Sequence, residues 1–140
     1  MPGFELIDQK EQLAIQKLFK KEKGILFAHG FDKLRKSYHV RDFEREIKKK
    51  TKAKYALAVS SGTAAIKISL LAMGVKPGDE VITQSFNFIA TAEAITSIGA
   101  KVIICSIDET LNMCPNDLKK KISKKTKAII PVHMLGVSAN

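Results

Sequence analysis

Four short apolar runs, separated by segments with helical character, constrain the fold of this chain more than any other feature. The runs occupy residues 55–59, 80–83, 101–107 and 127–132. The helical segments between them cover residues 63–73, a stretch that ends at Ile98, and residues 116–123. A strand–helix alternation of this kind predicts a parallel sheet built from βαβ units. We therefore expect an α/β fold.

The composition of these segments predicts where they are buried. The four runs are continuously apolar rather than alternating, as in strands that helices cover on both faces. Residues 63–73 are apolar almost all round, which predicts a deeply buried helix that stops at Gly74. For the next helix, either Ser85 or Asn87 is a candidate N-cap, and Gly99 is the stop signal.

The N-terminal part of the chain has a different pattern. Residues 8–21 predict a helix, residues 24–39 carry no clean period and suggest a loop or arm, and a helix restarts at Val40. We therefore divide the chain into an N-terminal helix and arm at residues 1–39 and an α/β part at residues 40–140.

The totals restrict the class of protein. The chain has 140 residues, 45% of them hydrophobic, which fits one globular domain. No apolar stretch is long enough to span a membrane, and the first residues contain no signal-peptide h-region, so we expect a cytoplasmic protein. The net charge of +10 comes mostly from lysine, with Arg35, Arg41 and Arg45 as the arginines. Because arginine is the better reader of guanine and phosphate, we expect no nucleic-acid partner.

The two cysteines predict neither a metal site nor a redox motif. Cys105 ends an apolar run and Cys114 precedes Pro115, a spacing that matches no zinc or CxxC pattern. We expect a buried Cys105 and two free thiols.

The turn after the first apolar run, Ser60-Ser61-Gly62-Thr63-Ala64, is the sharpest candidate site. It lies where ligands bind in parallel sheets, at the carboxyl end of a predicted strand and at the start of a helix. The first N–H groups of a helix have no internal acceptors and bind phosphate well, and Gly62 permits a close approach. The alternative is a plain N-cap by Ser61 or Thr63 without a ligand.

Two more features follow strand ends. Phe86 and Phe88 follow the second run, where an aromatic ring can either stack on a planar ligand or pack in the core. His133 follows the fourth run, where it can serve as a base or a cofactor neighbour, or form only a structural hydrogen bond. The residues themselves leave these alternatives open.

Taken in order, these pieces resemble the DegT/DnrJ/StrS family of pyridoxal-phosphate (PLP) dependent sugar aminotransferases. The resemblance covers residues 40–140 well and residues 1–39 poorly. It rests on residues 42–46, 55–65, 77–82, 85–91 and 126–133.

The resemblance implies a fold, a cofactor and a site. The chain would form part of the large domain of the aspartate-aminotransferase fold (type I), a mostly parallel sheet with helices on both faces. Gly62, Thr63 and Ala64 would hold the PLP phosphate, chiefly through the N–H groups of Thr63 and Ala64, and Phe88 would stack on the pyridine ring. His133 matches a recurrent family position without an assigned role. The family acts on nucleotide-linked keto-sugars with an amino-acid donor, and works as a homodimer.

The resemblance also implies what these residues lack. The Schiff-base lysine of the family would lie downstream, so the 140 residues contain no catalytic residue that we can assign and no metal site. We expect them not to transaminate alone. The ending just past a strand favours a truncated chain. The strand at residues 55–59 would lack a neighbour, which predicts an exposed sheet edge and a tendency to aggregate. A PLP-dependent sugar dehydratase relative and a non-catalytic remnant are the alternatives.

Overall fold

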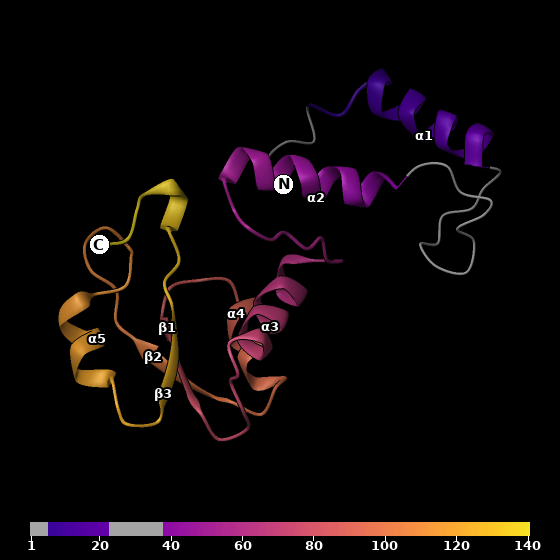
Figure 1. Ribbon diagram of the computed structural model, residues 1–140. Coiled ribbons are helices and arrows are strands. Elements are labelled where there is room, and N and C mark those ends of the chain that lie inside the picture. Colours follow the sequence, from indigo (N-terminus) through magenta and orange to yellow (C-terminus); the bar gives the residue numbers. More distant parts are fainter. Residues whose placement is uncertain (1–5, 23–37) are drawn as a thin grey trace. The chain divides into compact units, whose positions relative to one another are not determined.

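The computed structural model (Figure 1) describes residues 6–22 and 38–140. It divides into two compact units, Met1–Ala58 and Val59–Asn140. Most of the predicted arm at residues 24–39 lies outside the described residues, and our division of the chain at residues 39 and 40 stays a prediction.

The first unit contains the two helices that the sequence predicts, α1 (Gln9–Glu22) and α2 (His39–Thr51). At the start of α1, the Asp8 N–H donates to Glu11 Oε2 over 2.8 Å, and the carboxylate of Asp8 accepts from the Lys10 N–H. These bonds satisfy N–H groups at the helix start that have no intrahelical acceptor.

The predicted strand at residues 55–59 does not form. These residues belong to no sheet, and the side chains of Tyr55 and Leu57 are 77% and 70% exposed. The Ala58 N–H donates instead to Glu44 Oε1 on α2 over 2.8 Å. A strand exists only with a ladder partner, and the strands of the described residues pair only with one another. The prediction from apolar character was therefore wrong.

The second unit is built on a three-stranded parallel sheet. Its strands are β1 (Glu80–Gln84), β2 (Lys101–Cys105) and β3 (Thr126–Ile130), in the order β2-β1-β3. The other three predicted strands are thus confirmed, although β2 and β3 end two residues earlier than expected. β1 is the central strand, and its last four residues are all buried.

Helices cover both faces of this sheet, as predicted. In Figure 1, α3 (Gly62–Ala72) and α4 (Ala90–Thr96) lie on one face and α5 (Pro115–Lys121) on the other. Successive side chains of β1 point to opposite faces of the sheet. Val81 packs in the cluster that contains Leu70 and Ile95. Ile82 packs with Cys105 and Met113. The fold is α/β.

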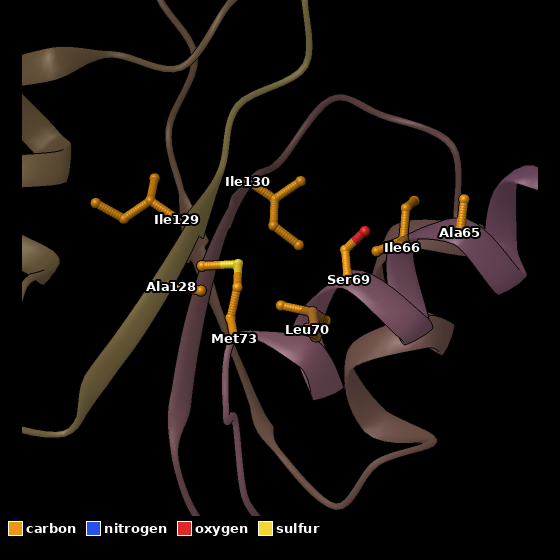
Figure 2. Close-up of a pocket in the computed structure, with 8 residues that line it drawn as sticks. All are labelled: Ala65, Ile66, Ser69, Leu70, Met73, Ala128, Ile129 and Ile130. Atoms are coloured by element: carbon orange, nitrogen blue, oxygen red, sulfur yellow. The ribbon is translucent and has the colours of Figure 1, made fainter. Parts of the chain in front are cut away.

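Helix α3 is less buried than its sequence predicts. Only Leu70 is fully buried, whereas Ile68, Leu71 and Met73 remain 41%, 51% and 58% exposed. The helix packs chiefly against α4 rather than against β3. An apolar groove of about 240 Å³ therefore remains between α3 and β3, and Figure 2 shows the residues that line it: Ala65, Ile66, Ser69, Leu70, Met73, Ala128, Ile129 and Ile130.

Helix α4 begins later than expected, and neither predicted residue caps it. Its N-cap residue is Ile89, which makes no side-chain cap bond. Asn87 instead donates from Nδ2 to Thr83 Oγ1 and to the Gln84 carbonyl, each over 2.9 Å. Its side chain holds the turn between β1 and α4, which a helix that started earlier would replace.

Candidate functional site

The start of α3 and the loops after the strands meet at the carboxyl edge of the sheet. Seven residues separate the end of α3 at Ala72 from the start of β1 at Glu80, so the C-terminus of α3 lies at the amino edge. The helix has 11 residues and is about 16 Å long, which brings its N-terminus to the carboxyl edge, as Figure 1 shows.

The first turn of α3 has a side-chain cap. Ser61 is the N-cap residue, and its Oγ accepts from the Ala64 N–H over 3.1 Å. Of the two predicted caps, the one by Ser61 is confirmed. The N–H of Ala64 is therefore engaged within the protein, whereas the N–H groups of Gly62 and Thr63 lie in the first turn, where no intrahelical acceptor exists.

Open space adjoins this turn at Gly62. A Cβ atom built on Gly62 would meet no atom within 4 Å, apart from its chain neighbours and the backbone of its own helix. The backbone of the turn is therefore accessible, and the helix dipole adds partial positive charge there. This arrangement can hold an anion through backbone N–H groups.

The two phenylalanines after β1 are not core residues. Phe86 is 49% exposed and Phe88 is 79% exposed, so the interpretation that they pack in the core is wrong. The carbonyl of Phe88 accepts from the Thr91 N–H in the first turn of α4, which fixes the backbone below the ring. An exposed ring at a strand end presents a face on which a planar ligand can stack.

His133 forms a structural hydrogen bond after β3. Its Nδ1 accepts from the Ala139 N–H over 3.0 Å, and the side chain is exposed. In the neutral imidazole, the proton must therefore lie on Nε2. The structure shows the structural hydrogen bond of His133, and a role as a base or cofactor neighbour stays a prediction.

Sequence reasoning missed two buried amides at this edge. Gln84 and Asn112 are each only 1% exposed, and their side chains bond to the loops after the strands. The signal was available at position 84, because a glutamine that ends an apolar strand has to satisfy its amide inside the protein. Asn112 lies in a loop, where composition alone does not predict burial.

The electrostatics of the opposite layer involve Cys105 and Asp117. Both cysteines are free, as predicted, and Cys105 is fully buried, so burial raises the pKa of its thiol, with the nearby Asp117 carboxylate adding to the effect. The Ser106 N–H donates to Asp117 Oδ2 over 2.8 Å and lowers the pKa of that carboxyl. Within residues 6–22 and 38–140, no cluster of three metal-ligating side chains occurs, and no helix is long and apolar enough to cross a membrane.

Comparison with known proteins assigns the family. Residues 25–140 match the DegT/DnrJ/EryC1/StrS aminotransferase family. The chain belongs to this family. The match begins earlier than residue 40, where the resemblance in the sequence became clear.

Among curated relatives, UDP-2-acetamido-2-deoxy-3-oxo-D-glucuronate aminotransferase from Pseudomonas aeruginosa is 46% identical over 89 residues, which cover 63% of this chain and 25% of that protein. Among solved structures, 3-amino-5-hydroxybenzoic acid synthase superposes with a TM-score of 0.83 at 34% identity, over 96% of this chain and 33% of that one. NtdA from Bacillus subtilis, with bound cofactor PMP, superposes with a TM-score of 0.78 at 30% identity, over 91% and 28%. The chain thus spans between a quarter and a third of the length of these proteins.

Proposed function

We propose that this chain provides the phosphate- and ring-binding part of a PLP-dependent aminotransferase that moves an amino group from an amino acid to a nucleotide-linked keto-sugar. The observation that carries the proposal is the open first turn of α3, which begins at Gly62 at the carboxyl edge of the sheet. Family membership and the PMP-bound relative support PLP as the ligand, because PMP is the amino form of the same cofactor. Bound PLP supplies the electron sink for amino-group transfer.

The phosphate would lie on the first turn of α3. The N–H groups of Gly62 and Thr63 would donate to it, with the helix dipole adding to the attraction. The Ser61 hydroxyl accepts from the Ala64 N–H and keeps its own proton, which it can donate to a phosphate oxygen. Ala64 would then take part both through its N–H, shared with Ser61, and by keeping Ser61 in place.

Phe88 would bind the cofactor ring. Its side chain is 79% exposed, so no core contact would have to break before it stacks on a pyridine ring. Burial of this ring against a ligand would offset the cost of exposing a large aromatic side chain to water.

We further propose that residues 40–140 are the N-terminal part of the PLP-binding large domain, and that the 140 residues alone do not transaminate. Amino transfer needs a lysine that binds the cofactor and moves the proton. None of the lysines of this sequence lies in the lysine motif of the family. Incubation with PLP, glutamate and a nucleotide-linked keto-sugar should give no 2-oxoglutarate, and its formation would refute this part of the proposal.

The setting that we propose is a cytoplasmic homodimer without a membrane or nucleic-acid partner. The relative that is named for a UDP-linked sugar supports nucleotide-linked sugars as substrates. The positive net charge of +10 favours such anionic substrates through electrostatic steering.

Equilibrium dialysis against PLP tests the proposed phosphate site on the first turn of α3. Gly62→Ala should weaken PLP binding about tenfold, because the added methyl group occupies the approach to the turn but meets no atom within 4 Å outside its chain neighbours and the backbone of its own helix. Phe88→Ala should also weaken binding, whereas Phe43→Ala, which removes a 58% exposed ring from α2, should not. Inorganic phosphate should compete with PLP. Equal PLP binding by the wild type and Gly62→Ala would refute the assignment.

A further inference from the structure

Buried polar side chains lie at the carboxyl end of β1 and in the loop after β2. Thr83 is 0% exposed, and Gln84 and Asn112 are each 1% exposed, whereas the preceding residues of β1, Val81 and Ile82, are apolar. Polar groups are costly to bury unless each is hydrogen-bonded. In the part of the chain that the structure describes, no buried side-chain nitrogen or oxygen atom lacks a hydrogen-bond partner.

Gln84 connects three loops through one amide. Its Nε2 donates to the Phe86 carbonyl over 3.0 Å and to the Leu111 carbonyl over 3.1 Å. Its Oε1 accepts from the Val132 N–H over 3.0 Å. One side chain thereby ties together the turn after β1, the loop after β2 and the segment after β3.

Asn112 adds a second connection between two of these loops. Its Oδ1 accepts from the Met134 N–H over 2.9 Å, and its Nδ2 donates to Thr110 Oγ1 over 3.0 Å. Val132 and Met134 flank His133, so Gln84 and Asn112 together hold the backbone on both sides of the histidine.

Thr83 and Asn87 complete the arrangement at the turn after β1. Thr83 Oγ1 donates to the Ile130 carbonyl over 3.2 Å and accepts from Asn87 Nδ2 over 2.9 Å. Asn87 also donates to the Gln84 carbonyl. Phe88 follows Asn87 and carries an exposed ring. Packing against the protein does not fix the direction of this ring. Polar bonds to its neighbours hold its backbone instead.

We propose that Gln84 and Asn112 are positioning residues that orient Phe88 and His133 for a ligand at the carboxyl edge of the sheet, which rests on the proposed PLP function. The partners of Gln84 are backbone groups of three loops, so its amide both satisfies these groups and sets the distances between the loops. Buried amides specify geometry more tightly than apolar contacts, because each bond requires a particular distance and angle.

Amide hydrogen exchange followed by NMR tests the geometry without a ligand. Gln84→Met keeps the length of the side chain and removes all three of its bonds, so exchange at the Val132 N–H should accelerate about tenfold. Asn112→Ala should have the same effect at Met134 and leave Val132 protected. Ile95→Val, which deletes one buried methylene group on α4, is the control for general destabilisation.

Equilibrium dialysis with PLP tests the functional part on the same variants. Gln84→Met should weaken PLP binding about tenfold, and Asn112→Ala less, whereas Ile95→Val should bind as the wild type does. In Gln84→Met, the NMR shifts of the Phe88 ring and the His133 imidazole should move, because the backbone next to both residues would lose its bonds to the Gln84 side chain.

Each outcome decides the proposal. Wild-type PLP binding in Gln84→Met, or a loss no larger than in Ile95→Val, would overturn it. If Gln84→Met does not fold, Asn112→Ala still decides, through Met134 exchange and the His133 shifts. If the wild-type protein takes up no PLP, the proposed function fails, but unchanged exchange at Val132 and Met134 in the variants would separately refute the positioning role.

Discussion

Strand β1 and residues 55–59 are both short apolar segments that precede a helix in this chain, yet only β1 is a strand. Val81 and Ile82 in β1 are 0% exposed, whereas Tyr55 and Leu57 are 77% and 70% exposed. β1 pairs with β2 on one side and β3 on the other, and residues 55–59 pair with no strand among the described residues. The difference shows that ladder partners, rather than apolar character, decide which run becomes a strand.

Truncation of one side chain in each segment tests this difference between β1 and residues 55–59. Ile82→Ala should lower the free energy of unfolding by about 2–5 kcal/mol, because it leaves a cavity in the core. Leu57→Ala should lower it by less than about 0.5 kcal/mol, because the side chain is exposed. Urea unfolding followed by circular dichroism measures both. A loss for Leu57→Ala as large as that for Ile82→Ala would mean that residues 55–59 are buried in a sheet after all.

Within the described residues, β3 has an unpaired edge, which should make the 140-residue chain prone to associate. Ile129 is 41% exposed on this edge strand, and an unpaired strand edge is a template for pairing with other chains. Ile129→Lys should therefore reduce concentration-dependent light scattering, whereas Phe43→Lys, with the same added charge on α2, should have a smaller effect. A wild-type chain that stays monomeric at high concentration and unfolds cooperatively would contradict the prediction.

The N-cap of α3 at Ser61 stabilises the helix that follows residues 55–59. Ser61→Ala should cost about 1 kcal/mol of stability, because the Ala64 N–H loses its acceptor. Ser61→Gly should lower the free energy of unfolding by only about a few tenths of a kcal/mol relative to the wild type. Ser60→Ala is the neighbouring control, and thermal unfolding measures all three. An unchanged melting temperature in Ser61→Ala would show that the cap bond does not form in solution.

The smallest effect that we expect is a pH dependence from Asp117, in the first turn of α5. The hydrogen bond from the Ser106 N–H lowers the pKa of Asp117 in the folded protein. A lowered pKa contributes stability that is present above the pKa of the unfolded chain, about 4, and is lost as the pH falls through the folded value. The melting temperature of Asp117→Asn should therefore depend less on pH below about 4 than that of the wild type. If the melting temperatures of Asp117→Asn and of the wild type fell equally as the pH is lowered, this prediction would be refuted.

Local sequence signals predicted much of this fold. The helices α1, α2, α3 and α5 and all three strands of the sheet followed from apolar period, from Gly74 as a stop, and from Pro115 at a helix start. The Ser61 cap was one of two predicted candidates and is confirmed. These features depend on the nearest few residues, so the sequence carries them directly.

Other features needed the tertiary structure. Helix α3 is as apolar as a buried helix, but only Leu70 is fully buried, because burial depends on what packs against it. Asn87 had the character of an N-cap and instead bonds to Thr83 and Gln84. The exposure of Phe86 and Phe88 was likewise undecided by residue type.

The sequence by itself determined the α/β class, the family and the turn at Gly62, because periodicity, punctuation by glycine and proline, and a run of family motifs are all local. Only the tertiary structure decided that residues 55–59 are not a strand and that the amides of Gln84 and Asn112 join the loops after the strands. The physical reason is that strand pairing and buried hydrogen bonds join residues distant in sequence, and a partner 48 positions away, as Val132 is from Gln84, leaves no trace in the local pattern.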